Sequence, residues 1–153
     1  MSDIIFPPGL VLILGACILP FVGMRLRNIL LLALPLIALA FVWMVPDGDA
    51  LRLSWLGYEL TPLRGDRLAR VFGTVFSIMA FGGGLYSLRQ ERTLELAAAY
   101  IYAGSALGVV FAADLLTVFV FWEAMALAST MVIWSAGERA WGPGIRYAII
   151  HLL

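Results

Sequence analysis

Long runs of uncharged, apolar residues dominate this sequence and restrict what the chain can fold into. Apolar residue types make up 63% of its 153 residues and charged types 13%, which is typical of a protein that meets lipid over much of its surface. A helix crosses the hydrocarbon core of a bilayer, about 30 Å thick, with about 20 residues. The sequence therefore predicts an all-α integral membrane protein with five transmembrane helices and the start of a sixth. The expected spans are 4–22, 29–45, 68–88, 94–113 and 115–135.

Residues 46–67 form the one long connection between these spans. Polar and apolar residues alternate there around Trp55, Tyr58 and Leu60, and this period of two favours a small hairpin at the membrane interface. The other connections are short, so neighbouring helices are expected to be antiparallel. We expect residues 1–153 to form a single membrane domain.

The positions of the arginines predict the orientation of the chain, because short cytoplasmic loops retain basic residues. All ten basic residues are arginines. Six arginines and three acids fall on the side reached after the first, third and fifth spans, which gives that side a net charge of +3. They are Arg25, Arg27, Arg89, Arg92, Arg139 and Arg146, with Glu91, Glu95 and Glu138. The other side holds four arginines and six acids: Asp3, Asp47, Asp49, Glu59, Asp66 and Asp114. We predict that the arginine-rich side is cytoplasmic and that the N-terminus is outside.

Composition also argues against several functional classes. The formal net charge is zero, so nothing in the sequence points to a nucleic-acid partner. The single cysteine, Cys17, excludes an internal disulfide and a cysteine-based metal cluster. We find no phosphate-binding loop or nucleophile triad, and we expect no cofactor, no metal and no autonomous catalysis from this chain.

The last eight residues, Arg146 to Leu153, begin another apolar helix. They extend only about 12 Å at 1.5 Å per residue, too little to cross the bilayer. A chain that ended there would hold a carboxylate at membrane depth, which is costly without a partner. We therefore expect either an N-terminal fragment of a longer subunit or one product of a split gene whose remainder is another chain.

Glu123 is the one acidic residue within the run Leu115 to Trp134. It lies eight residues into the fifth expected span, roughly 12 Å into the hydrocarbon. An ionisable residue at such depth costs about 2.5 to 3.5 kcal/mol on insertion scales and normally faces a bundle interior or a water-filled path. A structural ion pair or a hydrogen-bonded neutral acid is the alternative. No arginine in the expected spans lies at a matching depth, so we favour a site that binds and releases protons.

The segment ADLLTVFVFWEAMALAST, Ala113 to Thr130, follows a span that begins ELAAAYIYAGSALGVV. These two segments, with PLRGDRLARVFG ahead of them, resemble the N-terminal helices of antiporter-like membrane subunits. That family includes the large membrane subunits of respiratory complex I, of membrane-bound hydrogenases and of Mrp-type multisubunit Na+/H+ antiporters, and the D subunit of the Mrp type is most similar. Glu123 matches the family's proton-transferring glutamate on the fifth helix. The family's lysine partners from later helices have no counterpart here, and Thr130 stands where a tyrosine is common.

The resemblance implies a component of a multisubunit cation/proton antiporter in a bacterial inner (plasma) membrane, with other membrane subunits as partners and H+, and Na+ where it is coupled, as transported ions. A first alternative is a proton-pumping membrane subunit of a complex I-like NADH-quinone oxidoreductase or membrane-bound hydrogenase, with flavin and iron–sulfur centres in partner subunits. A second alternative is a non-conducting scaffold half.

Seven further residues are candidates for a proton path to Glu123. Hydroxyl groups of membrane helices orient water molecules but also bond to their own backbone, so each has a structural alternative. Asp66 and Asp114 have a simpler role as N-caps of the third and fifth spans. Histidine can relay protons near neutral pH, so His151 is a relay candidate, but a lone histidine equally serves packing. The path candidates are Asp66, Thr74, Ser77, Tyr102, Ser105, Thr130 and His151.

Overall fold

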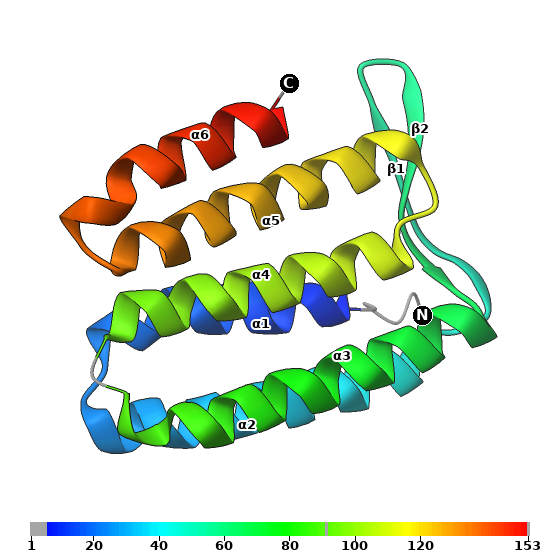
Figure 1. The fold of residues 1–153 in the computed structure, drawn as a ribbon. Coiled ribbons are helices and arrows are strands. Elements are labelled where there is room, and N and C mark those ends of the chain that lie inside the picture. Colours follow the sequence, from blue (N-terminus) through cyan, green and yellow to red (C-terminus); the bar gives the residue numbers. More distant parts are fainter. Residues whose placement is uncertain (1–5, 91, 153) are drawn as a thin grey trace.

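The computed structural model describes residues 6–90 and 92–152. Within them, six α-helices run back and forth and a two-stranded hairpin stands at one end of the bundle (Figure 1). The helices are α1 (Pro8–Ile18), α2 (Met24–Met44), α3 (Arg67–Tyr86), α4 (Thr93–Phe111), α5 (Leu115–Ser135) and α6 (Trp141–Leu152). Three 3-10 turns, η1 (Leu19–Phe21), η2 (Ser87–Arg89) and η3 (Glu138–Ala140), connect or extend them, and the strands are β1 (Gly48–Trp55) and β2 (Tyr58–Gly65).

Four helices in the described part of the chain are long and apolar enough to cross a membrane: α2, α3 with η2, α4 and α5. The sequence prediction of five full spans is not confirmed, because the first helix is shorter than the predicted span 4–22. It begins at Pro8 and becomes a 3-10 turn after Ile18, since Pro20 has no N–H for a helical hydrogen bond. Ile4 and Ile5 lie outside the described residues.

The other helix boundaries follow the prediction within a few residues. Helix α2 begins at Met24, five residues ahead of the expected start, and α5 has the expected bounds. Helix α6 begins at Trp141 rather than at Arg146, because Pro143 is tolerated in the first turn of a helix, where N–H groups have no helical partner.

The two strands form an antiparallel hairpin within the long connection 46–67. Leu56 and Gly57 make the tight turn, and both have positive φ angles, 50° and 82°, as a type I′ turn requires. The hairpin is fixed to the turn between α4 and α5 by two hydrogen bonds. The Thr61 N–H donates to Asp114 Oδ2 at 2.8 Å, and the Ala113 N–H donates to the Thr61 carbonyl at 3.0 Å.

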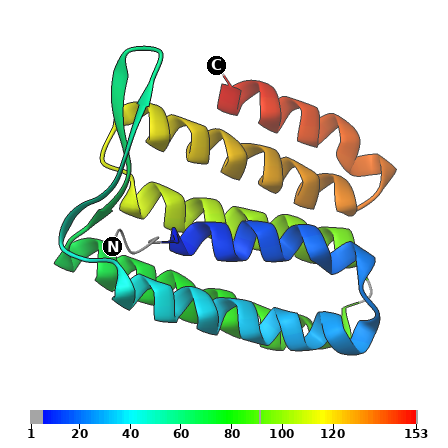
Figure 2. The same cartoon turned by 180° about the vertical axis from the view of Figure 1, so that it is seen from behind.

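Helix α4 lies at the centre of the bundle, between α3 and α5 and against α1 (Figures 1 and 2). Helix α6 packs outermost, on α5 (Figure 1). Glycines permit the close approach of α1 and α4. A Cβ atom on Gly104 would lie 2.6 Å from the Gly9 carbonyl oxygen, and one on Gly9 would lie 2.9 Å from the Gly108 nitrogen. The small residues therefore set the separation of these two helices.

A proline inside α2 is compensated from α4. Pro35 has no N–H, so the Leu31 carbonyl one turn earlier cannot receive its helical hydrogen bond. The Tyr100 hydroxyl of α4 donates to that carbonyl instead, and it also lies 3.3 Å from the Ala80 carbonyl oxygen of α3. Gly84 leaves room for this contact, because a Cβ atom there would collide with the Tyr100 hydroxyl and the Leu31 carbonyl. Three helices thus meet at one hydroxyl group.

The chain places its charged connections at two opposite ends of the bundle. We name them the hairpin end, with β1 and β2, and the arginine-rich end, where the turns after α1, α3 and α5 lie (Figure 2). Asp3 and Glu91, which entered the charge count, lie outside the described residues. Which end faces the cytoplasm stays a prediction of the arginine distribution.

Candidate functional site

Glu123 lies on α5, near the middle of the helix and on the side of the middle closer to the hairpin end. Eight residues separate it from Leu115, a rise of about 12 Å. The residue is half-buried, and its Oε2 atom is enclosed by protein with no hydrogen-bond partner among the described residues. A polar atom in that position is costly, by about 1 to 3 kcal/mol for a neutral group and more for a charged one. A proton, a water molecule or a group from another segment would relieve this cost.

No cation of the described residues pairs with Glu123. The salt bridges within 6–90 and 92–152 involve Arg52, Arg64, Arg70 and Arg92, all of them close to the bundle ends. A buried carboxylate held by a permanent cation would be a structural ion pair. Among the described residues, no cation is placed to form such an ion pair with Glu123.

Glu123 does not lie on the side of α5 that faces α4. Phe121 marks that side, because a Cβ atom on Gly108 of α4 would collide with its ring. Each helical residue turns by about 100°, so Glu123 lies about 200° further round the helix. Contacts to α6 come from Ser129, whose Oγ lies 2.8 Å from Tyr147 Oη, and from the Trp122 ring, 6.2 Å from the His151 ring. Trp134, eleven residues after Glu123 and about 20° round the helix from it, also contacts α6, because its Nε1 donates to the Trp141 carbonyl at 3.3 Å.

The helical face of Glu123 is only partly covered. Ala126 and Thr130, three and seven residues further along, are buried. Phe119, Val120 and Leu127 are between 57% and 59% exposed, and Leu116 is also exposed. We call these four apolar residues and Glu123 the open α5 face. An acid therefore sits beside apolar side chains that the described chain covers only in part.

Three of the predicted path hydroxyls bond to their own helices. Thr74 Oγ1 donates to the Arg70 carbonyl at 2.7 Å, and Ser77 Oγ donates to the Gly73 carbonyl at 2.8 Å. Thr130 Oγ1 donates to the Ala126 carbonyl, also at 2.8 Å. These bonds are the structural alternative that the sequence left open for each hydroxyl.

The remaining path candidates are dispersed. Asp66 caps α3 by accepting the Ala69 N–H at 2.7 Å, at the hairpin end. Ser105 is fully buried on α4, and its hydroxyl has no partner among the described residues. Tyr102 is 41% exposed, and His151 is exposed with its ring 4.8 Å from that of Tyr147. Helix α4 separates the α3 candidates from α5 (Figures 1 and 2), so the described chain does not connect them to Glu123.

Asp114 caps the helix that carries Glu123, as the sequence predicted. Its Oδ1 accepts the Thr117 N–H at 2.8 Å, and its Oδ2 accepts the Thr117 hydroxyl at 2.7 Å as well as the hairpin N–H of Thr61. Burial alone would raise the pKa of Asp114, but the hydrogen bonds from Thr117 and Thr61 hold this pKa below its usual value. Asp114 is therefore a charged anchor of the α4–α5 turn at neutral pH.

Sequence reasoning missed two polar contacts. It gave no role to Ser129 and Tyr147, whose hydroxyl pair joins α5 to α6. It used Glu95 only as a charge, whereas Glu95 Oε2 is enclosed at the arginine-rich end and lies 3.9 Å from Arg92 Nη1. The sequence indicates that Glu95 lies in the first turn of the fourth span, but whether its Oε2 atom is enclosed depends on tertiary packing.

The described residues contain no group of three or more His, Cys, Asp or Glu side chains placed to hold a metal ion. Arg27 is buried at the arginine-rich end, and its guanidinium group donates to Thr93 Oγ1 at 3.0 Å. Thr93 and Glu95 line a separate cavity of about 770 Å³ beside Trp134, away from Glu123.

Comparison with known proteins gives one informative similarity. No protein-family model matches the chain. Over 93 residues the chain is 28% identical to a protein named NAD(P)H-quinone oxidoreductase subunit 5, chloroplastic, from Chara vulgaris. The match covers 61% of this chain and 14% of that relative, so the chain spans only a small part of the relative's length.

This similarity supports the resemblance at the level of complex I and antiporter-like membrane subunits, and it does not single out the Mrp type. Together with the apolar helices, it supports a multi-pass membrane protein. The relative is chloroplastic, so the similarity does not support a bacterial plasma membrane in particular.

Proposed function

We propose that this chain is a proton-translocating membrane component of a multisubunit assembly and that Glu123 binds and releases the transported proton. The observation that carries the proposal is the enclosed Glu123 Oε2 atom, which lacks a hydrogen-bond partner in the described chain and lies near the middle of an apolar helix. Such a group is expensive to keep for packing alone.

The open α5 face supports the same proposal. Lipid is a poor neighbour for an acid at this depth, whereas another helix with a polar or cationic side chain would both cover the apolar residues and complete the carboxyl group. We propose that such a helix comes from another segment of the assembly. Protonation would then be governed by two opposed effects, since desolvation favours the neutral acid and a nearby cation favours the carboxylate.

In the proposed cycle, Glu123 takes a proton from a water path open to one side and gives it up to a path open to the other. Movement of the facing cation toward or away from the carboxyl group would change its proton affinity between these two states. Asp114 and the hairpin would hold the start of α5 in place during the cycle through their three hydrogen bonds.

Two sources of driving energy are candidates. The segments around Glu123 resemble Mrp-type subunits, which favours a cation/proton antiporter. The similarity to an NAD(P)H-quinone oxidoreductase subunit favours a redox-driven pump whose flavin and iron–sulfur centres lie in partner subunits. The absorption spectrum of the purified native assembly separates them, because flavin and iron–sulfur bands belong only to the redox-driven type.

The test of the proton site is Glu123→Gln in membrane vesicles that contain the whole assembly, with proton flux followed by a pH-sensitive dye. We expect flux to be lost in Glu123→Gln and partly kept in Glu123→Asp, at equal amounts of assembled protein. Glu138→Gln is the matched control, since Glu138 is exposed at the arginine-rich end. Normal flux in Glu123→Gln would reject the proton site and favour the scaffold function.

A further inference from the structure

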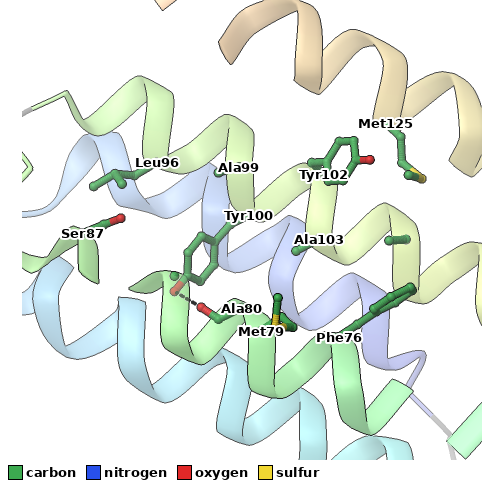
Figure 3. Close-up of a pocket in the computed structure, with 12 residues that line it drawn as sticks. Phe76, Met79, Ala80, Ser87, Leu96, Ala99, Tyr100, Tyr102, Ala103 and Met125 are labelled. Carbon is green, nitrogen blue, oxygen red and sulfur yellow. Dashed lines mark hydrogen bonds between the residues drawn. The ribbon is translucent and has the colours of Figure 1, made fainter. Parts of the chain in front are cut away.

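A laterally open cavity of about 400 Å³ lies between α3 and α4 and reaches α5 at Met125 (Figure 3). Its wall is almost entirely apolar and includes five small residues. They are Ala80, Gly83, Ala99, Ala103 and Ala106. Met79, 71% exposed, lies on its rim. Helices α3 and α4 are both candidate membrane spans, so the opening of this cavity would face the hydrocarbon of the bilayer.

The length of the cavity matches one leaflet. It extends from Ser87 of η2, at the arginine-rich end, along α3 to Phe76, near the middle of that helix (Figure 3). The eleven steps along the chain from Phe76 to Ser87 correspond to about 16 Å at 1.5 Å per residue. One leaflet contributes about half of the 30 Å hydrocarbon core. The cavity therefore follows the path that a lipid chain takes from the interface to the bilayer midplane.

The cross-section excludes a helix as the occupant. Over about 16 Å, a cylinder 10 Å across has a volume of roughly 1,250 Å³, about three times the roughly 400 Å³ of this cavity. An α-helix with side chains is about 10 to 12 Å across and does not fit. A single hydrocarbon chain, whose carbons make contacts at about 4 Å, does.

The charge at the mouth selects the headgroup. Arg89 is exposed and follows the lining residue Ser87 by two residues in η2. Arginine forms strong charge-assisted hydrogen bonds to phosphate oxygens. We propose that this cavity binds one acyl chain of an anionic phospholipid from the leaflet at the arginine-rich end, with its phosphate group at Arg89.

Native mass spectrometry of the full chain, extracted from nanodiscs with equal amounts of phosphatidylglycerol and phosphatidylcholine, tests the proposal. We expect one phosphatidylglycerol molecule to remain bound per chain after detergent washing. Ala99→Phe with Ala103→Phe should fill the channel and remove the bound lipid, and Arg89→Gln should remove the preference for phosphatidylglycerol. Ala136→Phe and Arg139→Gln, which change exposed residues outside the cavity, are the matched controls. Unchanged retention in the double variant, or equal retention of both lipids by the unmodified chain, would overturn the proposal.

A second measurement does not need the cavity-filling variants and so does not depend on whether those variants fold. A photoreactive phenylalanine analogue at Met79, in native membranes that contain the whole assembly, should cross-link to phospholipid. Cross-linking to a polypeptide instead would show that a protein segment covers the cavity, and the lipid proposal would fail. Glu123→Gln should leave lipid retention unchanged, because this binding site does not depend on the proposed proton site.

Discussion

Replacing Tyr100 by Phe removes one hydroxyl and leaves the ring that packs in the bundle. The hydroxyl is the donor to the Leu31 carbonyl, which has lost its helical donor to Pro35. Interhelical hydrogen bonds in membranes contribute on average about 0.6 kcal/mol and at most about 1.7, since the unfolded chain finds other partners. The Leu31 carbonyl has no helical alternative, so we expect a loss near the upper value, about 1.5 kcal/mol of unfolding free energy.

Tyr100→Phe should reduce the free energy of unfolding by less in a protein that lacks Pro35. In a Pro35→Ala background, the Ala N–H at position 35 can donate to the Leu31 carbonyl, and Tyr100→Phe then loses only the long contact to Ala80, about 0.5 kcal/mol. The predicted coupling between positions 35 and 100 is therefore about 1 kcal/mol. This exceeds the error of about 0.3 to 0.5 kcal/mol within which independent sites add.

The assay is reversible unfolding of the four proteins of this cycle in mixed micelles, with increasing denaturing detergent and circular dichroism as the signal. Tyr102→Phe is the matched control, because it removes a hydroxyl from an exposed tyrosine of the same helix. We expect that control to change stability by less than about 0.5 kcal/mol. An equal cost of Tyr100→Phe in both backgrounds would refute the compensation of Pro35 by Tyr100.

Three further predictions concern packing, pH and the hairpin turn. Gly104→Ala places a Cβ atom 2.6 Å from the Gly9 carbonyl oxygen and should cost about 2 kcal/mol in the same unfolding assay, whereas Gly82→Ala enters open space and should be neutral or slightly stabilising. Because the pKa of Asp114 is lowered in the folded protein, its contribution is present above about pH 4 and is lost as the pH falls through the folded-state value. The protection factor of the Thr61 N–H, which compares its exchange with that of the unfolded chain at the same pH, should therefore fall in acid, and in Asp114→Ala it should already be low at neutral pH. Leu56→Asn suits the positive φ of 50° and should stabilise the hairpin by about 0.5 to 1 kcal/mol, measured as slower hydrogen exchange in β1 and β2, and no change would argue against strain at this turn.

Several local features were readable without the fold. The bounds of α5, the caps at Asp66 and Asp114 and an antiparallel hairpin within 46–67 follow from short-range rules on apolar runs, capping residues and alternation. The first span was overestimated, because an apolar run does not reveal that Pro20 converts its end to a 3-10 turn. The hydroxyls of Thr74, Ser77 and Thr130 show the same limit, since the sequence allowed each a local or a path role and among the described residues each bonds to its own helix.

The sequence by itself determined the chemical problems of this protein: an acid at position 123 within an apolar run, a carbonyl at Leu31 without its donor, and glycines where helices can approach. The tertiary structure alone decided how each is met. Tyr100 supplies the donor from 69 residues away, and α4 and α6 cover two sides of α5 while the open α5 face remains. Hydropathy and capping act within a few residues of the chain, whereas the partner of a buried polar group depends on which helices pack together.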